Sequence, residues 1–232
     1  MAPRNAALAC LASLLLTTMV SAQYAPNVTY QQLYKSFPSS AFVYNPTDSL
    51  AASNNVTQLT NAGGTSTKRS VSEFPALAGN GLAQTVFTLG PCGLRQPHEH
   101  PRGSGLLYAI QATNLQVGFV LLDGTQVINN ISTGASAIFP QGLVHYQQNL
   151  DCAPAKYIIT YNDAEAQTVN SVPALFNLPA AAVVQVLGLT ADQYAQLKST
   201  SVDGNFVPGS DPACMARCGL SLPAAQKATG GR

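Results

Sequence analysis

All three histidines of the chain lie in two short segments with the residue types of a transition-metal site. His98 and His100 are in the run Pro97-His98-Glu99-His100-Pro101, and the third is His145. On a strand, residues i and i+2 point to the same face, so His98 and His100 can reach one point together. Neutral imidazole is the commonest metal ligand. The pattern favours a shared metal pocket over unrelated surface or core histidines.

The same alternation selects amide side chains beside the histidines. Gln147 and Asn149 follow His145 by two and four residues, so they lie on the same strand face. Gln96 precedes His98 by two residues and should share its face, although Pro97 can disturb the alternation of the strand. We therefore expect Gln96, Gln147 and Asn149 in a substrate pocket. A neutral amide outside the pocket is the alternative for Gln147.

Charged residues near the histidines are few. Glu99 lies between His98 and His100, so on a strand it faces away from them and is not expected to be a ligand. Arg95 and Arg102 could attract a small anionic substrate, but we interpret both as solvated surface residues. No nucleophile elbow and no phosphate-binding glycine loop accompanies them.

Short β-like runs must position these side chains. They are rich in Val, Ile, Tyr and Phe and are separated by Gly, Pro, Asn and Asp. The runs are Gln84–Leu89, Leu106–Ile110, Leu115–Leu122, Thr125–Ile131, Ser136–Phe139, Leu143–Gln148 and Lys156–Tyr161. Asp123-Gly124 predicts a hairpin between two of them. Strands of this length and spacing favour an all-β sandwich or barrel.

Helix signals appear only after the strands. An apolar run follows Pro179 and should end at Gly188. Thr190 and Gln193 form a capping-box pattern that opens a second short helix, to about Lys198. These helices could cover one sheet or dock on another subunit.

The first residues are predicted to be a secretory signal peptide. Arg4 precedes an apolar stretch at 6–20, and Val20-Ser21-Ala22 has the small residues of a cleavage site. The chain then divides by composition into the signal peptide 1–22, a wrapping irregular segment 23–79, a barrel core 80–172, a C-terminal helical segment 173–220 and a flexible tail 221–232. We expect a secreted, extracellular product.

The charge pattern excludes two partner classes. Only 9% of the 232 residues are charged, with 11 basic against 10 acidic. Neither a nucleic-acid groove nor a polybasic membrane patch fits this balance, because both need clustered Lys and Arg. Beyond the signal, no apolar stretch reaches about 18 residues, so no membrane span is expected.

Cysteines and Asn-x-Ser/Thr triplets agree with export. An even number of cysteines remains beyond the signal: Cys92, Cys152, Cys214 and Cys218. In an oxidising compartment they predict disulfides, in any of three pairings, and a zinc cluster is the rival interpretation. The glycosylation acceptors are Asn27, Asn55 and Asn130.

With these residues in view, the chain resembles the secreted germin-like cupins, particularly the spherulin-like branch. Its second segment matches the second cupin motif, Gly-x5-Pro-x-Gly-x2-His-x3-Asn, at Gly134, Pro140, Gly142, His145 and Asn149. The resemblance covers roughly residues 84–220. It implies a cupin jelly-roll β-barrel with a C-terminal helical appendage, and trimers or hexamers whose helices clasp neighbouring subunits.

One departure from the germin pattern concerns the metal. Germins carry a Glu ligand five residues after the second His, where this chain has Gly105 before Leu106-Leu107-Tyr108. The resemblance implies manganese, held here by His98, His100 and His145 alone. Three neutral imidazoles leave the metal charge uncompensated and suit Cu²⁺ or Zn²⁺ better than Mn²⁺.

Two functions follow from this resemblance. The first is a metal-dependent oxidoreductase of the germin type with weak dismutase-like activity, in which the missing Glu argues against full oxalate oxidase or decarboxylase activity. The second is a non-catalytic cell-wall, spore or host-interaction protein. Whether the chain is an enzyme is left open between them.

Overall fold

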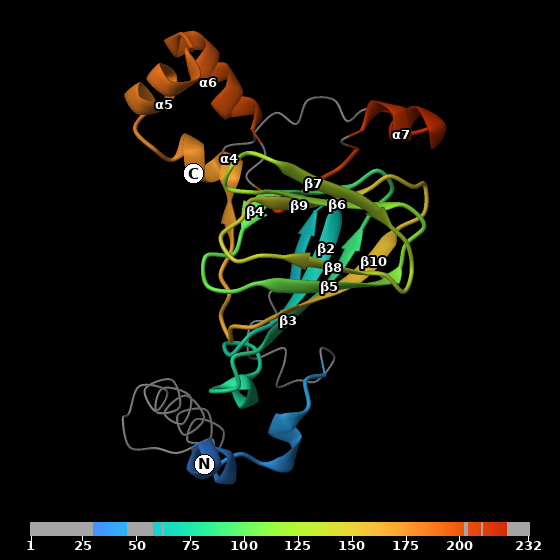
Figure 1. The fold of residues 1–232 in the computed structure, drawn as a ribbon, viewed down its shortest axis with the longest axis vertical. Helices are drawn as coiled ribbons and strands as arrows, with labels where there is room; N and C mark the ends of the chain where they lie inside the picture. The colour runs from blue at the N-terminus through green and yellow to red at the C-terminus, as the bar shows by residue number, and fades with distance from the viewer. Residues whose placement is uncertain (1–29, 46–57, 62, 202–203, 210, 222–232) are drawn as a thin grey trace, which may run out of the picture.

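The structure, a computed structural model, describes residues 30–45, 58–61, 63–201, 204–209 and 211–221. Two antiparallel sheets enclose the core, and the helices stand outside them (Figure 1). The signal peptide, Asn27, Asn55 and most of the tail 221–232 lie outside the described residues. Within the described part of the chain, no helix is both long and apolar enough to cross a membrane.

The first sheet has the strand order β1-β2-β3-β10-β5-β8. Its members are β1 (Gln58–Asn61), β2 (Gly64–Arg69), β3 (Ala83–Leu89), β10 (Ala155–Tyr161), β5 (Gly105–Gln111) and β8 (Ser136–Phe139). In β3, residues alternate between buried and partly exposed along the whole strand, which is the signature of a sheet with one face on the core.

The second sheet carries the histidines and has the order β11-β4-β9-β6-β7, with β12 also pairing with β4. Its members are β11 (Val169–Asn170), β4 (Leu94–Glu99), β9 (His145–Asn149), β6 (Leu115–Val120), β7 (Gln126–Ile131) and β12 (Phe206–Val207). The predicted hairpin joins β6 to β7, where Gly124 has φ 87° and the Asp123 carboxylate accepts a hydrogen bond from the Thr125 amide at 2.9 Å.

The space between the sheets is filled by inward-facing apolar side chains from both. Those with less than 2% exposure include Leu89, Leu107, Leu115, Phe139, Tyr157 and Ile159. The two sheets and this shared core confirm the predicted cupin jelly-roll.

Segment 23–79 differs from the irregular chain that we expected there. Strands β1 and β2 pair with each other, and β2 pairs with β3 along its whole length. The polar β2 sequence Gly-Thr-Ser-Thr-Lys-Arg lacks the apolar alternation that predicts a strand. Pairing with the strongly alternating β3 supplies the structure that β2 does not specify by itself. The short helices α2 (Tyr30–Lys35), η1 (Ser39–Phe42) and η2 (Pro75–Leu77) complete the described part of this segment.

The C-terminal helical segment confirms both helix predictions. Helix α5 (Ala180–Leu187) ends at Gly188, which has φ 64°, and α6 (Ala191–Thr200) begins with the reciprocal hydrogen bonds between Thr190 and Gln193. These helices stand away from the barrel beyond α4 (Ser171–Phe176), whereas α7 (Pro212–Arg217) lies against the end of the barrel (Figure 1).

Candidate metal centre

The three histidines meet on the inner face of the second sheet. His98 and His145 are direct partners across the antiparallel pair β4–β9, with ring centroids 4.2 Å apart. His100, just beyond β4, places its ring centroid 5.2 Å from each of them. All three side chains are buried, and one ring nitrogen of each lies within 4.8 Å of the others.

Backbone carbonyls fix which ring nitrogen of each histidine is a ligand. Each Nδ1 faces a carbonyl oxygen: His98 faces Gln96 at 2.8 Å, His145 faces Leu143 at 2.8 Å, and His100 faces Gln167. A carbonyl oxygen only accepts, so each Nδ1 carries the proton and Nε2 keeps its lone pair. The Nε2 atoms of His100 and His145 are buried and have no hydrogen-bond partner among the described residues.

Burial keeps these imidazoles neutral. It lowers the pKa of His98 well below its ordinary value, and the positive charge of Arg95 lowers it further. Burial also lowers the pKa of His100 to about 4 and that of His145 to about 3, outweighing the backbone carbonyls that favour protonation. All three rings are therefore in the neutral, singly protonated form at neutral pH, and this form can bind a metal through Nε2.

The donor set fits a divalent transition metal. Burying an imidazole nitrogen without a hydrogen bond is unfavourable, and a metal bound to Nε2 removes that cost. An Nδ1–H donated to a carbonyl is also the usual support of a metal-bound histidine. His98, His100 and His145 are the residues that would hold the ion. Glu99 between the first two is only partly buried and does not line their cavity.

A cavity of about 250 Å³ adjoins two of the three histidines, His98 and His100. Beside His98 and His100 it is lined by Arg95, Lys68, Tyr161 and polar residues that include Thr85 and Thr168. The described residues that line it include no carboxylate. The cavity is therefore electropositive, although Lys68 is paired with Glu165.

Arg95 is in this cavity and not on the solvated surface where we expected it. It is only 4% exposed, and burial lowers its pKa to about 10. Its Nη1 donates to Asn170 Oδ1 at 2.9 Å and to the Asn205 carbonyl at 3.0 Å. The pairing of β4 with β9 shifts register between Arg95 and His98, so a bulge brings both to the inside. Pro97 within this stretch was the sequence signal for such a break. Arg102 is exposed, as expected, and lies 3.5 Å from Asp163.

The predicted amides are all buried but differ in their surroundings, and none of them lines the cavity. Gln96 donates its Nε2 to the Gly204 carbonyl. Asn149 donates to the carbonyls of Gly90 and Ala153 and supports the turns at the end of the barrel. Gln147 is fully buried; its Oε1 accepts from the Tyr157 hydroxyl at 3.4 Å, while its Nε2 has no partner among the described residues.

Tyr161 is a site residue that the sequence reasoning missed. Its ring lies edge-on to His100 with centroids 4.6 Å apart, and it lines the cavity. Burial raises the pKa of its hydroxyl, so the phenol stays protonated. The alternation of β10, in which Tyr157, Ile159 and Tyr161 are all buried, was the signal that could have placed it inside.

The cysteines form two disulfides, which excludes the zinc cluster in this oxidised form. Cys92 is bonded to Cys214, and Cys152 is bonded to Cys218. This selects one of the three pairings that the sequence allowed. The remaining described glycosylation acceptor, Asn130, is exposed on β7.

Sequence comparison relates the chain to one family. A family profile described as "Cupin" matches residues 49–191. Spherulin-1B of Physarum polycephalum is 31% identical over 161 residues, which cover 69% of this chain and 64% of the spherulin. Germin-like protein 9-3 of Oryza sativa subsp. japonica is 34% identical over 143 residues, covering 62% of this chain and 61% of that protein. The chain thus spans less than two thirds of the length of these relatives.

Solved structures share the fold at lower sequence identity. A recombinant oxalate oxidase in complex with glycolate has a TM-score of 0.62 at 23% identity, covering 72% of this chain and 83% of its own. Oxalate decarboxylase OxdC of Bacillus subtilis, described with Mn(II) centres, has a TM-score of 0.59 at 22% identity, covering 65% of this chain and 39% of its own. At this identity the likeness concerns the fold.

Proposed function

The chain belongs to the cupin family, and from this premise we propose that it is a secreted germin- and spherulin-like protein that binds a divalent transition metal through His98, His100 and His145. The observation that carries the proposal is the set of three buried imidazoles whose Nδ1 atoms are held by backbone carbonyls. This arrangement orients the lone pairs of the rings before any metal arrives.

The ligand set favours copper or zinc over manganese. Imidazole nitrogens suit Cu²⁺ and Zn²⁺, whereas Mn²⁺ prefers oxygen ligands and stands lowest in the divalent affinity order. When bound, such an ion supplies a Lewis acid and, in the case of copper or manganese, a one-electron redox centre. The Gln167, Gln96 and Leu143 carbonyls would keep the three rings oriented toward it.

The substrate that fits the neighbouring cavity is a small anion. Arg95 is a buried guanidinium, and no carboxylate among the described residues lines the cavity beside it. A buried cation is costly unless a charge of opposite sign lies nearby. A carboxylate ligand that enters the cavity would provide that charge. We therefore extend the proposal to binding of a small carboxylate next to the histidines.

Elemental analysis of purified protein tests the metal site directly. We expect about one transition-metal ion for each chain, with copper or zinc exceeding manganese. His98→Ala should lower this stoichiometry severalfold, whereas Glu99→Gln, on the adjacent and only partly buried residue, should keep it. Stoichiometric manganese would contradict the metal preference, and equal metal content in both variants would contradict the site.

Activity assays can distinguish between two functions of this site. One is a weak oxidoreductase of the superoxide dismutase type. The other is a non-catalytic extracellular protein of the cell wall, spore or host interface. Superoxide and oxalate assays on copper-, zinc- and manganese-loaded protein decide between them. Metal-dependent turnover that His98→Ala abolishes supports the enzyme, and inactivity with every metal supports the second use.

Secretion is supported by the covalent structure of the domain. Two disulfides persist in an oxidising compartment and are rare in the cytosol. Asn130 is exposed on β7, so an export pathway could glycosylate it. Detection of the protein in culture medium, starting near Gln23 and with a glycan on Asn130, tests this part of the proposal.

A further inference from the structure

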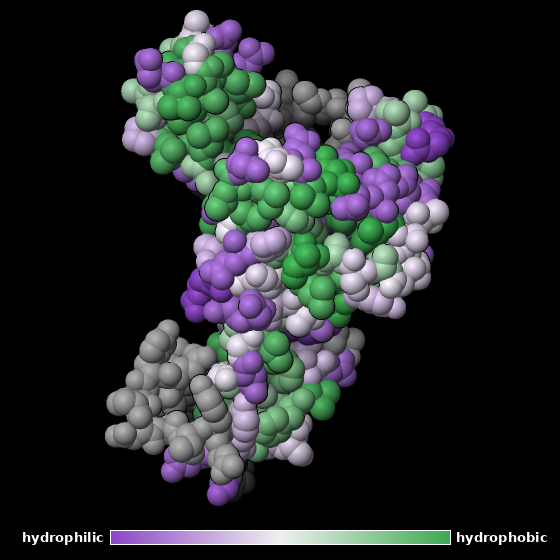
Figure 2. All heavy atoms as spheres, in the orientation of Figure 1, coloured by the Kyte–Doolittle hydropathy of each residue, from purple (hydrophilic) through white to green (hydrophobic). Residues whose placement is uncertain are grey.

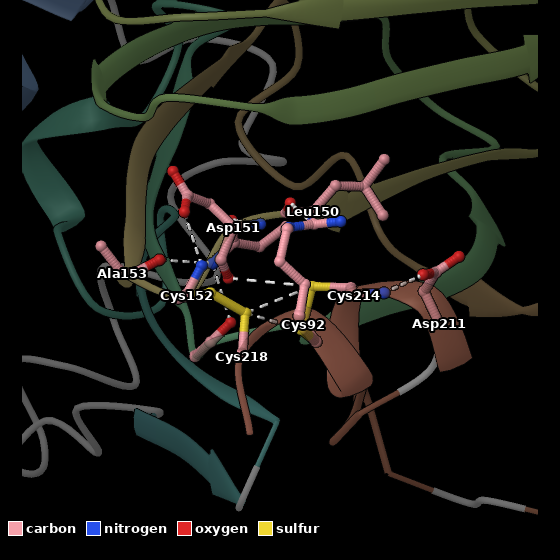
Figure 3. The surroundings of a disulfide bond; sticks show 11 residues. Cys92, Leu150, Asp151, Cys152, Ala153, Asp211, Cys214 and Cys218 are labelled. Atoms are coloured by element: carbon pink, nitrogen blue, oxygen red, sulfur yellow. Dashed lines mark hydrogen bonds between the residues drawn. A yellow bond between two sulfur atoms is a disulfide. The ribbon is translucent and has the colours of Figure 1, made fainter. Parts of the chain in front are cut away.

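The two disulfides lie side by side at one end of the barrel (Figure 3). Cys92–Cys214 joins the turn before β4 to helix α7, and Cys152–Cys218 joins the turn before β10 to the residue that ends α7. The Cys218 Sγ is 3.8 Å from the Cys92 Sγ and 4.0 Å from the Cys214 Sγ. Cys218 therefore contacts both sulfurs of the neighbouring disulfide.

The two bonds differ in their access to solvent. Cys92 and Cys214 are fully buried, with 0% exposure. Cys152, in contrast, is exposed, and Cys218 is half-buried between it and the inner bond. A thiol in solution can thus reach the outer disulfide at Cys152, whereas the inner disulfide is reached through Cys218.

From these contacts we propose that the outer disulfide is a thiol-exchange site for low-molecular-weight thiols, and that Cys218 passes the exchange to the inner disulfide. The thiolate of the incoming molecule attacks the Cys152 Sγ, forms a mixed disulfide with it and releases the Cys218 thiolate. That thiolate attacks the Cys92 Sγ, forms a Cys92–Cys218 bond and releases the Cys214 thiolate. Cys214 takes up the proton that the incoming thiol lost, so no net oxidation or reduction occurs.

Contacts of α7 other than the disulfides keep Cys218 in place after the outer bond opens. The Asp211 carboxylate caps the helix by accepting from the Cys214 amide at 2.5 Å, and Arg217 Nη2 donates to the Leu150 carbonyl at 2.6 Å. The Cys218 amide also donates to the Cys214 carbonyl at 2.9 Å. The Cys218 sulfur lies beside the Cys92–Cys214 bond, so a rotation of its side chain brings it in line with the bond that it breaks, and the short distance keeps its effective concentration high. After the exchange, helix α7 is bonded to Cys92 through Cys218 in place of Cys214, so the helix stays attached to the barrel.

A single-cysteine substitution tests the transfer. In Cys152→Ser the Cys218 thiol has no bonded partner, and peptide mass mapping after alkylation should find Cys92–Cys218 alongside Cys92–Cys214. The matched control is Cys218→Ser, which leaves the free thiol on Cys152; it should keep Cys92–Cys214 alone, because the short sulfur distances involve Cys218. A Cys152→Ser protein with only Cys92–Cys214 and alkylated Cys218 overturns the proposal, as does equal exchange in the control.

The unsubstituted protein provides a second test that does not depend on whether a variant folds. Folded protein is incubated with glutathione, alkylated and mapped. We expect glutathione on Cys152, a new disulfide at Cys218 and an alkyl group on Cys214. Three results would each overturn the proposal: glutathione on Cys218, an alkylated Cys218 beside an intact Cys92–Cys214 bond, or no uptake of glutathione by the folded protein.

Discussion

Gly105 and Tyr161 are partners across the β5–β10 ladder, and the Tyr161 ring takes up the space beside Gly105. A Cβ atom added at Gly105 would lie 3.3 Å from the Tyr161 Cε1 and 2.9 Å from the Ile159 Cγ2. The same tyrosine ring packs edge-on against His100. The position where the germin pattern has a carboxylate is thus closed by the core in this chain.

Restoring that carboxylate should therefore fail without a second change. We expect Gly105→Glu to lower the free energy of unfolding by about 1–3 kcal/mol through overpacking, and to give no gain in manganese affinity. Chemical unfolding and manganese titration measure the two effects. In a double-mutant cycle, Ile159→Ala removes the methyl group that would crowd a Cβ atom at position 105. Gly105→Ala should therefore destabilise the protein less in the Ile159→Ala background than it does alone. Additive effects would contradict the steric explanation.

Arg95 should control the binding of small carboxylates. We expect glycolate or oxalate to raise the melting temperature of the metal-loaded protein, and Arg95→Gln to remove most of this shift because the buried cation of the cavity is gone. Differential scanning fluorimetry over a ligand series is sufficient. Arg102→Gln, which alters an exposed arginine, is the control and should respond like the unsubstituted protein. An unchanged shift in Arg95→Gln would refute the assignment.

Glu73 should make stability depend on acid pH. Burial alone would raise the pKa of its carboxyl, but hydrogen bonds from the Ser70 amide and hydroxyl, among others, lower it below the ordinary value. The unfolded chain then binds more protons than the folded one below about pH 4.5, so stability falls as pH decreases through this range. Urea unfolding should show Glu73→Gln clearly less stable than the unsubstituted protein at about pH 7, with the difference shrinking at about pH 3. A constant difference would exclude this linkage. Glu99→Gln controls for the change in net charge.

The α5–α6 hairpin should dock on another copy of the chain. Val186 on α5 is 79% exposed, and Leu187 and Leu197 are each 44% exposed. Apolar side chains gather on this hairpin, which stands away from the barrel (Figure 2). We expect light scattering to find an oligomer, of three or six chains by the germin resemblance, and Val186→Asp to reduce its mass. Gln185→Asp, one residue earlier on the helix, should not. A monomeric unsubstituted protein would rule out this role.

Much of the fold could be predicted because its signals are local. The alternation in β3 and β10 places the core side chains, Asp123-Gly124 sets a hairpin, and Thr190 with Gln193 begins α6. The spacing of His98 and His100 put two imidazoles on one face. Strand β2 escaped prediction because its polar sequence depends on pairing with β3.

The amino-acid sequence by itself determined which residues could bind a metal, and it predicted the strand that carries His145 but not β4, which carries His98. Only the tertiary structure decided that Arg95 turns into the cavity, that Ile159 and Tyr161 close the space at Gly105, and that Cys218 contacts the Cys92–Cys214 bond. These relationships depend on a bulge, on strand register and on how distant segments pack. None of the three follows from residue spacing along a single strand.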